Sequence, residues 1–348
     1  MSVRVSLANA GIHFSAPPSA TLLEAALDAG FNLPHSCKTG HCLACRARLL
    51  SGEIAYPEGV PLALGEQERA AGELLLCRAQ ARSDLTLELL SPTLARAHRS
   101  RRLPCRIERA EEWGHDVRGL FLRMPAAAPL VFEAGQYIDI LIERGRRRSF
   151  SIASPPHEPH LLEVHVRRVP GGELTGRLFE PGIEGRLLHV EGPLGQFVYR
   201  ESDRPLLLIG GGTGLAPLKC IVRHVLERGS GRRALRLYWG VRSERDLYAH
   251  AWLEATARRA PAFDYRPVLS EPSATWSGRR GWVHDCVLAE LGELAPYDIY
   301  ASGPPAMIEA VQSAFPRHGA DPQRLHFDSF DFAPDSVARQ RMSASSSD

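Results

Sequence analysis

The sequence lacks any apolar run long enough to cross a bilayer, which takes about 20 residues; stretches such as Leu206–Ile209 have the length of buried strands. Residues 1–10 lack the apolar core of a secretion signal. The chain also lacks an excess of charge, with 42 Lys and Arg against 40 Asp and Glu. This balance argues against a nucleic-acid binder, which needs a basic face. We therefore expect a cytoplasmic globular protein that binds neither membranes nor nucleic acid, and its 348 residues predict two or three domains.

Lysine is nearly absent from the chain. Only Lys38 and Lys219 contribute to the 42 basic residues, and all the others are arginine. Because this skew extends along the whole sequence, we interpret it as a compositional bias without functional weight.

The seven cysteines are an odd number in a chain without a secretion signal, which disfavours a disulfide framework. Cys37, Cys42 and Cys45 have the spacing C-x4-C-x2-C, and Cys77 follows further along the chain. This spacing is typical of a plant-type 2Fe–2S cluster. Zinc motifs usually pair two C-x2-C units, or one such unit with two histidines, so zinc is the weaker alternative. The remaining cysteines are expected to be ordinary buried residues: Cys105, Cys220 and Cys286.

The segments around these cysteines predict a small α+β domain. Residues 3–7 and 84–89 alternate like strands, and residues 21–29 form a short amphipathic helix pattern with Thr21 near its start. Together with the cysteine loop, they resemble the β-grasp fold of plant-type ferredoxins over residues 1–92. Many members of that family have glycine directly after the second cysteine, where this chain has Leu43.

Residues 93–102 have little apolar periodicity and predict a solvated linker. From residue 103 to about 200 the chain contains short strand patterns separated by turn residues, at 135–140, 148–152 and 161–167. Several short strands at such spacing predict a small antiparallel β-barrel.

Three motifs of this second segment resemble, in order, those of the ferredoxin–NADP reductase superfamily. They are R-S-F-S at 148–151, G-G-E-L-T at 171–175 and G-P-L-G-Q-F at 192–197. The resemblance implies that the barrel binds FAD rather than FMN.

The same resemblance assigns roles to single residues of the barrel. It places Arg148 at the flavin nucleotide's phosphates, Phe150 on the isoalloxazine ring and Ser151 near the redox-active nitrogen. The glycine-rich turn would hold the pyrophosphate at the start of a helix opened by Thr175; this turn contributes Gly171, Gly172, Leu174 and Thr175. The neighbouring Arg146 and Arg147 are expected to form an exposed basic turn.

The third segment, 201–335, predicts a nucleotide-binding domain with a parallel sheet. An apolar strand at 204–210 leads into Gly211, Gly212, Thr213 and Gly214, and a helix pattern follows at 218–227. A strand, a glycine turn and a helix N-terminus form a cradle for dinucleotide phosphates. The turn lacks the third glycine of G-x-G-x-x-G but resembles the reductase superfamily's own turn along its full length.

The next predicted strand, at 234–240, is followed by Arg242, Glu244 and Asp246. An acidic residue here would hold the ribose hydroxyl of NADH, whereas an arginine would favour the 2′-phosphate of NADPH. The pattern resembles that of NADH-using oxygenase reductases, which favours NADH. Both acidic residues could equally be solvated loop charges.

A strand at 298–301 leads into Ser302, Gly303 and Pro304, which resemble the superfamily's turn beside the nicotinamide. Ser302 replaces the family's cysteine. The aromatic stretch that follows resembles the one that shields the flavin; Phe330 is our candidate, while Phe327 or a plain core role stays open. Ser151, Ser302 and Phe330 are therefore the catalytic candidates, and the serine-rich residues 336–348 are predicted to be disordered.

The whole chain resembles reductase components of phenol hydroxylase, methane monooxygenase and ring-hydroxylating dioxygenases, and CDP-6-deoxyglucoseen reductase. A flavin can accept the electron pair of NAD(P)H and release the electrons singly to a cluster. The resemblance implies a monomeric reductase that passes electrons from NAD(P)H through FAD and the cluster to an oxygenase or a deoxysugar dehydratase. The alternatives are a flavin reductase with a vestigial cluster domain and a zinc-stabilised, non-catalytic scaffold.

Overall fold

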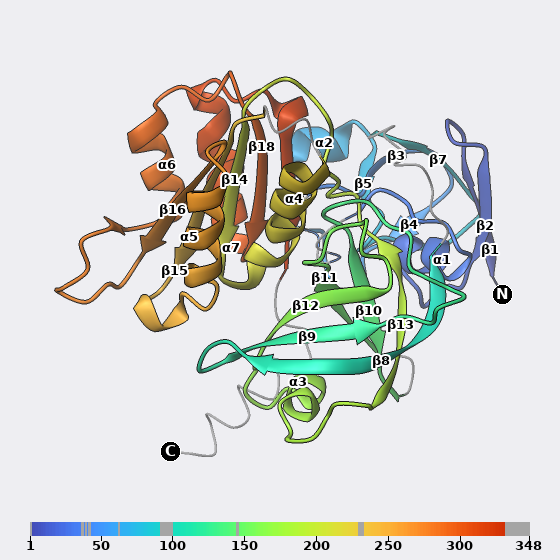
Figure 1. Ribbon diagram of the computed structural model, residues 1–348. Helices are drawn as coiled ribbons and strands as arrows, with labels where there is room; N and C mark the ends of the chain where they lie inside the picture. Colours follow the sequence, from blue (N-terminus) through green and yellow to red (C-terminus); the bar gives the residue numbers. More distant parts are fainter. Residues whose placement is uncertain are drawn as a thin grey trace, which may run out of the picture. The chain divides into compact units, whose positions relative to one another are not determined.

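The computed structural model describes residues 2–35, 38, 40, 43–61, 63–90, 100–143, 146–228 and 233–330. The chain forms two compact units (Figure 1). The first unit comprises Met1–Arg101 and Pro193–Val198, and the second comprises Arg102–Gly192 and Tyr199–Asp348.

The first unit contains a mixed five-stranded sheet with the order β2-β1-β7-β3-β5. Its strands are β1 (Val3–Leu7), β2 (Ile12–Ala16), β3 (Arg46–Ser51), β5 (Glu73–Leu75) and β7 (Leu85–Leu89). The first strand pairs in parallel with β7, and the other described pairs are antiparallel, as a β-grasp fold requires. The unit also contains short elements: β4 (Ile54–Ala55), β6 (Gln80–Ala81) and α2 (Glu66–Ala70).

Helix α1 (Leu22–Asp28) confirms the predicted amphipathic helix. The Thr21 side chain accepts a hydrogen bond from the Glu24 backbone N–H, and the Glu24 carboxylate accepts one from the Thr21 N–H. This capping box fixes where the helix begins, because it satisfies two backbone donors that the helix leaves unpaired. The apolar positions of α1 are buried.

The second unit contains the predicted antiparallel barrel. Its six strands have the order β11-β10-β13-β8-β9-β12. They are β8 (Arg101–Glu112), β9 (Val117–Arg123), β10 (Tyr137–Leu141), β11 (Arg147–Ser151), β12 (Leu161–Arg167) and β13 (Leu187–Leu194), with α3 (Glu173–Leu178) between the last two. An antiparallel bridge between Ile152 and Val164 joins the two ends of this order and so closes the barrel. Strand β8 begins at Arg101, so it includes the last two residues of the predicted linker.

A six-stranded parallel sheet follows in the same unit, with the order β17-β16-β15-β14-β18-β19. Its strands are β14 (Leu206–Gly211), β15 (Leu235–Val241), β16 (Phe263–Leu269), β17 (Arg279–Arg280), β18 (Asp298–Gly303) and β19 (Leu325–Ser329). The helices are α4 (Leu215–Arg228), α5 (His250–Arg259), α6 (Val283–Leu291) and α7 (Pro305–Ala314), with 3₁₀ turns at Gly212–Gly214, Glu244–Asp246, Phe315–His318 and Pro322–Arg324. Figure 1 shows helices on both sides of the sheet, which explains why β14 is buried along its whole length.

The order of the parallel sheet reverses at β14. The next strand in the chain, β15, lies on one side of β14, while β18 lies on the other. In open α/β sheets, ligands bind beyond the carboxyl ends of the strands at such a switch point. The glycine turn and the Ser302–Pro304 turn both stand at this position.

Within the described residues, no helix combines the length and the hydropathy that a bilayer span requires. The predicted disordered tail, 336–348, lies outside the described residues, as does most of the predicted linker.

Candidate functional site: a pocket at the switch point

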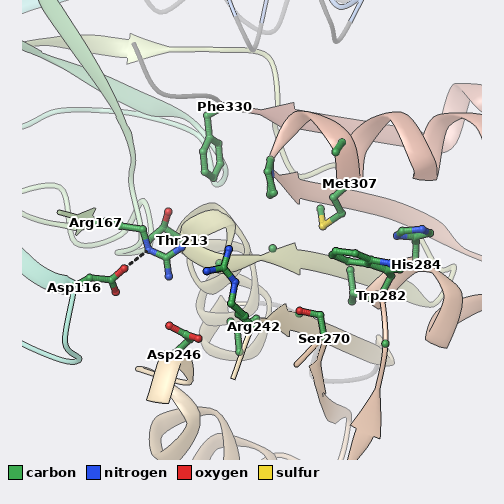
Figure 2. Close-up of a pocket in the computed structure, with 18 of the residues that line it drawn as sticks. Asp116, Arg167, Thr213, Arg242, Asp246, Ser270, Trp282, His284, Met307 and Phe330 are labelled. Atoms are coloured by element: carbon green, nitrogen blue, oxygen red, sulfur yellow. Dashed lines mark ion pairs between the residues drawn. The ribbon is translucent and has the colours of Figure 1, made fainter. Parts of the chain in front are cut away.

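A pocket of about 590 Å³ opens in the second unit at the carboxyl ends of the parallel strands (Figure 2). Its walls come from the turns after β14, β15 and β18, and from residues of the barrel. Seven residues singled out from the sequence line it: Gly211, Gly212, Thr213, Arg242, Asp246, Pro304 and Phe330. Segments far apart in the sequence therefore meet where the motifs predicted a nucleotide site.

The glycine turn, Gly211–Gly214, packs closely against the end of β18 and the start of α7. A Cβ atom at position 211 would lie 2.8 Å from Met307 Sδ, and one at 214 would lie 2.1 Å from the Ser302 carbonyl oxygen. Gly212 has a φ of +56°, in the left-handed region that favours glycine. The Trp239 indole N–H donates to the Gly212 carbonyl at 2.9 Å. These contacts hold the turn and the start of α4 as the predicted strand–turn–helix arrangement.

Ser302 and Gly303 lie at the end of β18 but do not line the pocket. Ser302 is completely buried, and its Oγ has no hydrogen-bond partner among the described residues. An unpaired buried hydroxyl costs about 1–3 kcal/mol of stability. Gly303 packs against Gly211, with a Cβ at 303 falling 3.1 Å from the Gly211 Cα.

Ser151 of the barrel reaches the parallel sheet beside these residues. Its hydroxyl donates to Asp328 Oδ2 at 3.3 Å, and Asp328 is the register partner of Ser302. Phe330 lines the pocket, and its N–H donates to the Gly303 carbonyl at 3.3 Å. Phe327 instead packs against the hydrophobic core of the sheet. The structure thus brings the three predicted catalytic residues to one end of β18 and β19, and of the two phenylalanines it is Phe330 that lines the pocket.

The predicted flavin residues lie on β11 and around α3. Arg148 and Phe150 share one face of β11, because alternate strand residues point the same way, and both are half-buried. Arg148 Nη1 donates to the Arg147 carbonyl at 2.8 Å. Gly171 has a φ of +70°.

Two details of this region differ from the sequence expectation. Helix α3 begins at Glu173, so Thr175 does not open it; the Thr175 Oγ1 accepts a hydrogen bond from the Val169 N–H at 3.2 Å. This contact explains Gly172, since a Cβ there would lie 2.5 Å from Thr175 Oγ1. Leu174 is a buried core residue.

The two arginines where β11 begins, Arg146 and Arg147, are not simply exposed. Arg146 Nη2 pairs with Glu173 Oε2 at 2.7 Å, and Arg147 Nη1 lies 3.5 Å from Glu191 Oε2. Both arginine side chains are partly buried, so these ion pairs connect this segment to α3 and β13. We expected an exposed basic turn, and this was wrong. The carboxylates that pair with the two arginines are distant in sequence, so no local pattern indicates them.

The two acidic residues after β15 are engaged within the protein. Asp246 Oδ2 accepts hydrogen bonds from the Ser243 N–H at 2.9 Å and from its hydroxyl at 2.7 Å. Burial would raise the pKa of Asp246, but these hydrogen bonds outweigh it and lower that pKa. Glu244 accepts from the Ser273 N–H at 3.0 Å. Asp246 is buried and is therefore not a solvated loop charge, whereas Glu244 stays accessible to solvent. The Arg242 side chain is 72% exposed and lines the pocket.

Sequence reasoning missed several pocket residues. Trp282 and His284 line one side of the pocket, and Trp282 is 64% exposed although it is a large apolar side chain. From the barrel come His115, Asp116 and Arg167, with Arg167 Nε 3.1 Å from Asp116 Oδ2 (Figure 2). Trp282 follows a glycine and precedes a helix pattern, but no local signal places either group at the pocket.

The first unit brings two of the predicted cluster ligands together. Cys45 immediately precedes β3 and Cys77 follows β5, and these strands pair with Arg46 opposite Leu75. The Leu76 N–H donates to the Cys45 carbonyl at 3.0 Å. Both thiols are buried and free of disulfides. Cys37 and Cys42 lie outside the described residues.

The cysteine loop contains left-handed residues. Gly40 has a φ of +87°, and Lys38 and Leu43 each have a φ of +58°. The glycine that many family members have after the second cysteine therefore has a conformational reason, and Leu43 adopts the same region at a cost of about 1–2 kcal/mol.

Two of the three other cysteines fit the expectation of ordinary buried residues. Cys105 and Cys220 are buried, and burial raises the pKa of each thiol to about 12. Cys286 is only half-buried, at the edge of the sheet's core.

Three family models match the chain in succession. They describe a 2Fe-2S iron-sulfur cluster binding domain at residues 5–82, an oxidoreductase FAD-binding domain at 104–199 and an oxidoreductase NAD-binding domain at 208–313.

Several characterised proteins are similar over nearly the whole chain. A CDP-6-deoxy-L-threo-D-glycero-4-hexulose-3-dehydrase reductase of Yersinia pestis is 36% identical over 95% of this chain and 99% of its own. An aromatic O-demethylase reductase subunit of Amycolatopsis is 38% identical over 90% and 94%. The crystal structure of an Amycolatopsis cytochrome P450 reductase has a TM-score of 0.80 at 35% identity, over 95% of this chain and all of the other.

Proposed function

Because this chain belongs to the iron–sulfur flavoprotein reductases that combine 2Fe–2S, FAD-binding and NAD-binding domains, we propose that it takes electrons from NADH and delivers them singly to a partner protein. It is an NAD(P)H oxidoreductase that uses FAD and a 2Fe–2S cluster. A bound flavin supplies the conversion of a two-electron hydride donor into single electrons, the form in which a 2Fe–2S cluster accepts them. The pocket at the switch point carries the assignment of the nucleotide site.

The turns that line the pocket and the volume of the pocket both suit a dinucleotide. Gly211, Gly212, Thr213 and Gly214 would hold the phosphates, because the turn ends at the N-terminus of α4, where backbone N–H groups and the helix dipole favour an anion. Pro304 and Phe330, which line the pocket, would lie against the nicotinamide. Ser302 and Gly303 would support this wall through their close packing against Gly211 and Gly214. The orphaned Ser302 hydroxyl supports a functional role there, because buried polar groups are otherwise paired.

The other side of the pocket would hold the adenosine half. Trp282 offers an exposed aromatic face, and Arg242 an exposed guanidinium. Asp246 caps its own 3₁₀ turn, and Glu244 bonds to Ser273, so we do not base the preference for NADH on a carboxylate after β15. We base that preference on the resemblance to NADH-using reductases.

The barrel would hold FAD through the residues named from its motifs: Arg148, Phe150, Ser151, Gly171, Gly172, Leu174 and Thr175. The fit rests on the shared face of Arg148 and Phe150, and on the approach of Ser151 to Asp328. Leu174 and Thr175 would act by shaping the turn, since one is in the core and the other bonds the turn's own backbone.

The cluster would be held by Cys37, Cys42, Cys45 and Cys77. The structure describes two of these residues, and it places them at the same end of paired strands, buried and without a disulfide. Thiolate ligands with this spacing suit a 2Fe–2S centre.

The partner that we propose is an oxygenase component or a deoxysugar dehydratase. The support is that relatives include a hexulose dehydrase reductase, an O-demethylase reductase subunit and the electron transfer component of a xylene/toluene monooxygenase. We also propose that the chain acts as a cytoplasmic monomer, with domains at 1–92, 103–200 and 201–335; the three family matches fall within these limits.

An anaerobic absorption spectrum of the reconstituted protein tests the function. We expect flavin and iron–sulfur bands, and NADH should bleach both. Absence of both bands would refute the proposal, and one equivalent of zinc without acid-labile sulfide would favour the scaffold alternative.

A cysteine variant separates the reductase from a flavin reductase with a vestigial cluster. Cys42→Ser should abolish cytochrome c reduction and spare ferricyanide reduction, because only the former needs the cluster. Cys105→Ser is the matched control and should spare both. Equal losses of both activities in Cys42→Ser would count against the proposed electron path.

A further inference from the structure

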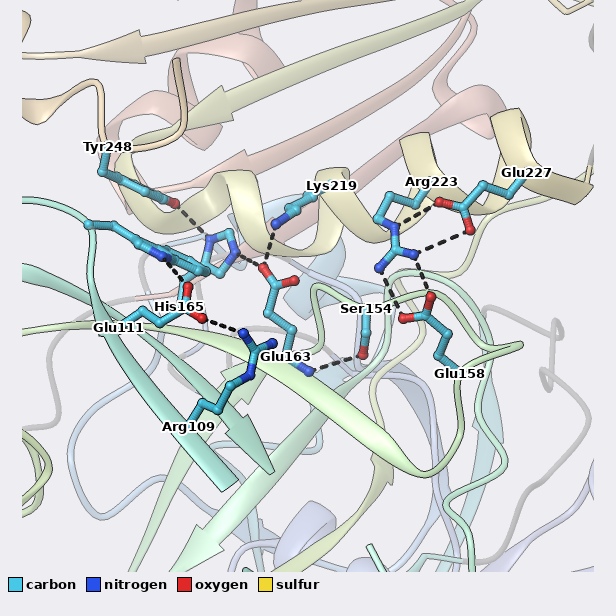
Figure 3. A network of polar contacts seen from close by, with 11 residues as sticks. Arg109, Glu111, Ser154, Glu158, Glu163, His165, Lys219, Arg223, Glu227 and Tyr248 are labelled. Carbon is cyan, nitrogen blue, oxygen red and sulfur yellow. Dashed lines mark hydrogen bonds and ion pairs between the residues drawn. The ribbon is translucent and has the colours of Figure 1, made fainter. Parts of the chain in front are cut away.

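One face of β12 connects the barrel to the parallel sheet through a buried polar network (Figure 3). Glu163 Oε1 accepts from the Lys219 ammonium of α4 at 2.6 Å and lies 2.8 Å from His165 Nε2. His165 Nδ1 lies 2.8 Å from the Tyr248 hydroxyl. The side chains of Glu163, His165 and Lys219 are 7%, 0% and 10% exposed. Helix α4 and the segment between β15 and α5 are therefore both bonded to β12, through its alternate residues Glu163 and His165.

The network is internally balanced in charge. Burial would raise the pKa of Glu163, but the hydrogen bond from His165 and the charge of Lys219 outweigh it and hold that pKa well below its usual range. Burial lowers the pKa of His165, so the imidazole is neutral. Its Nε2–H then donates to Glu163, and its Nδ1 accepts from Tyr248. The Glu163 carboxylate pairs with the Lys219 ammonium, and the His165 imidazole hydrogen-bonds to both Glu163 and Tyr248.

Lys219 is unusual in this chain, because it is one of two lysines among 42 basic residues. Besides Glu163, its ammonium faces the rings of Trp252, 4.7 Å from the centroid, and Trp113, 5.3 Å away. A compact ammonium suits a niche with one carboxylate and two aromatic faces, whereas an arginine would bring a planar fork of five donors. The site itself therefore explains why lysine stands here in a chain that otherwise uses arginine.

The position of Lys219 connects the network to the nucleotide turn. It lies in the second turn of α4, the helix that begins directly after Gly212–Gly214. On the same face of β12, Arg167 reaches that turn, with its Nη1 3.2 Å from where a Gly212 Cβ would be. The ion pair of Lys219 and Glu163 thus fixes α4 against the strand that also carries Arg167 into the pocket.

We propose that Lys219, acting through Glu163 and His165, is a positioning residue for hydride transfer: it sets the nucleotide turn against the flavin barrel and so sets the distance from nicotinamide to flavin. This inference rests on the proposed function. Rates of transfer between bound groups fall about 100-fold for a misplacement of about 1 Å, so loosening the network should slow transfer more than it weakens binding.

The same helix offers a matched control. Arg223, one turn further along α4, pairs with Glu158 Oε2 at 3.0 Å, in the loop before β12, and with Glu227. The Glu158 side chain is 43% exposed, and Arg223 lies further from the nucleotide turn. This pair connects the same helix to the same part of the barrel, but at the solvated rim.

The test uses the FAD-loaded full-length protein. It compares a double variant, which carries both Glu163→Met and Lys219→Met, with the single variant Arg223→Lys. Replacing both partners of a buried ion pair by apolar residues is often neutral for stability. The double variant also leaves the buried His165 without its Glu163 partner, and we expect the fold to tolerate this single unpaired group. Anaerobic stopped-flow measures flavin reduction by NADH, and titration measures NAD⁺ affinity. Amide hydrogen exchange over residues 211–219 is measured in the protein without nucleotide.

We expect the double variant to reduce its flavin at least about tenfold more slowly, with NAD⁺ affinity within threefold and faster exchange at 211–219. Arg223→Lys should match the wild type in all three. If the double variant reduced its flavin at the wild-type rate, or if both variants lost rate equally, the proposal would be overturned. If the double variant fails to fold, Lys219→Arg takes its place under the same criteria. A wild type whose flavin NADH never reduces would instead refute the proposed function.

Discussion

Gly214 and Ser302 are packed backbone to backbone. A single added carbon at position 214 would lie 2.1 Å from the Ser302 carbonyl oxygen and 2.9 Å from the Gly303 Cα. The Gly211–Gly214 turn and the Ser302–Pro304 turn thus support each other directly, at the point where the parallel sheet reverses its order. The glycine at 214 is required by this contact, and not only by the approach of a ligand.

Gly214→Ala should therefore separate the two turns. We expect it to lower the free energy of unfolding by about 1–3 kcal/mol, the usual effect of overpacking, and to weaken NAD⁺ binding. Urea unfolding and NAD⁺ titration measure the two effects. Gly176→Ala is the control: a Cβ there meets nothing within 4 Å, and alanine in a helix should gain about 0.5–1 kcal/mol. Equal stability of the two variants would contradict the packing argument.

Trp282→Ala should weaken the binding of the adenosine half of the nucleotide alone. Stacking of a base on an aromatic ring contributes about 1–3 kcal/mol, so KM for NADH should rise about 10-fold or more with kcat nearly unchanged. Reduced nicotinamide mononucleotide, which lacks adenine, should be used equally well by variant and wild type. Leu187→Ala, which removes another exposed apolar side chain that does not line the pocket, should change neither KM. A rise in both KM values in Trp282→Ala would contradict an adenine site.

His326 should make stability dependent on pH. Burial, with a smaller contribution from Arg200, lowers the pKa of His326 to about 4, and its ring packs on Tyr300 with centroids 4.5 Å apart. The folded protein thus favours the neutral imidazole, so stability is complete above pH 6.5 and falls as the pH decreases toward 4. Between pH 7 and 5 this residue should contribute a loss of about 2 kcal/mol.

Urea unfolding of the wild type and of His326→Gln at pH 7 and pH 5 measures this contribution. Glutamine does not titrate, so the variant should lose less stability on acidification by that amount. An identical loss in both proteins would show that other groups cause the acid sensitivity.

Leu43→Gly should stabilise the cluster loop. Leu43 has a φ of +58°, which costs about 1–2 kcal/mol for a residue with a side chain, while glycine loses about 0.5–1 kcal/mol to its flexibility in the unfolded chain. The net gain should slow the thermal bleaching of the cluster absorption. The same change at Leu50, which lies in the extended strand β3, should destabilise the unit. If both changes accelerated bleaching, the left-handed strain would not limit the loop.

Much of the fold could be predicted because its signals are local. The alternation at 3–7 and 161–167 coincides with β1 and β12, and the Thr21 capping box marks the start of α1. The prediction was wrong where a side chain bonds to a backbone group outside the pattern that suggested its role. Thr175 resembles a helix start, yet its hydroxyl bonds to Val169 and the helix begins at Glu173.

The sequence alone determined the three kinds of domain, and it predicted the cysteine ligands and the two nucleotide turns, because these signals depend mainly on local spacing. The tertiary structure decided that Asp246 serves its own loop, that Trp282 and Arg167 line the pocket and that Lys219 pairs with Glu163, 56 residues away. A charge or an aromatic ring has the same local signature whether it faces solvent, a ligand or a partner. Only the closure of the barrel and the order of the sheet bring the partner within reach.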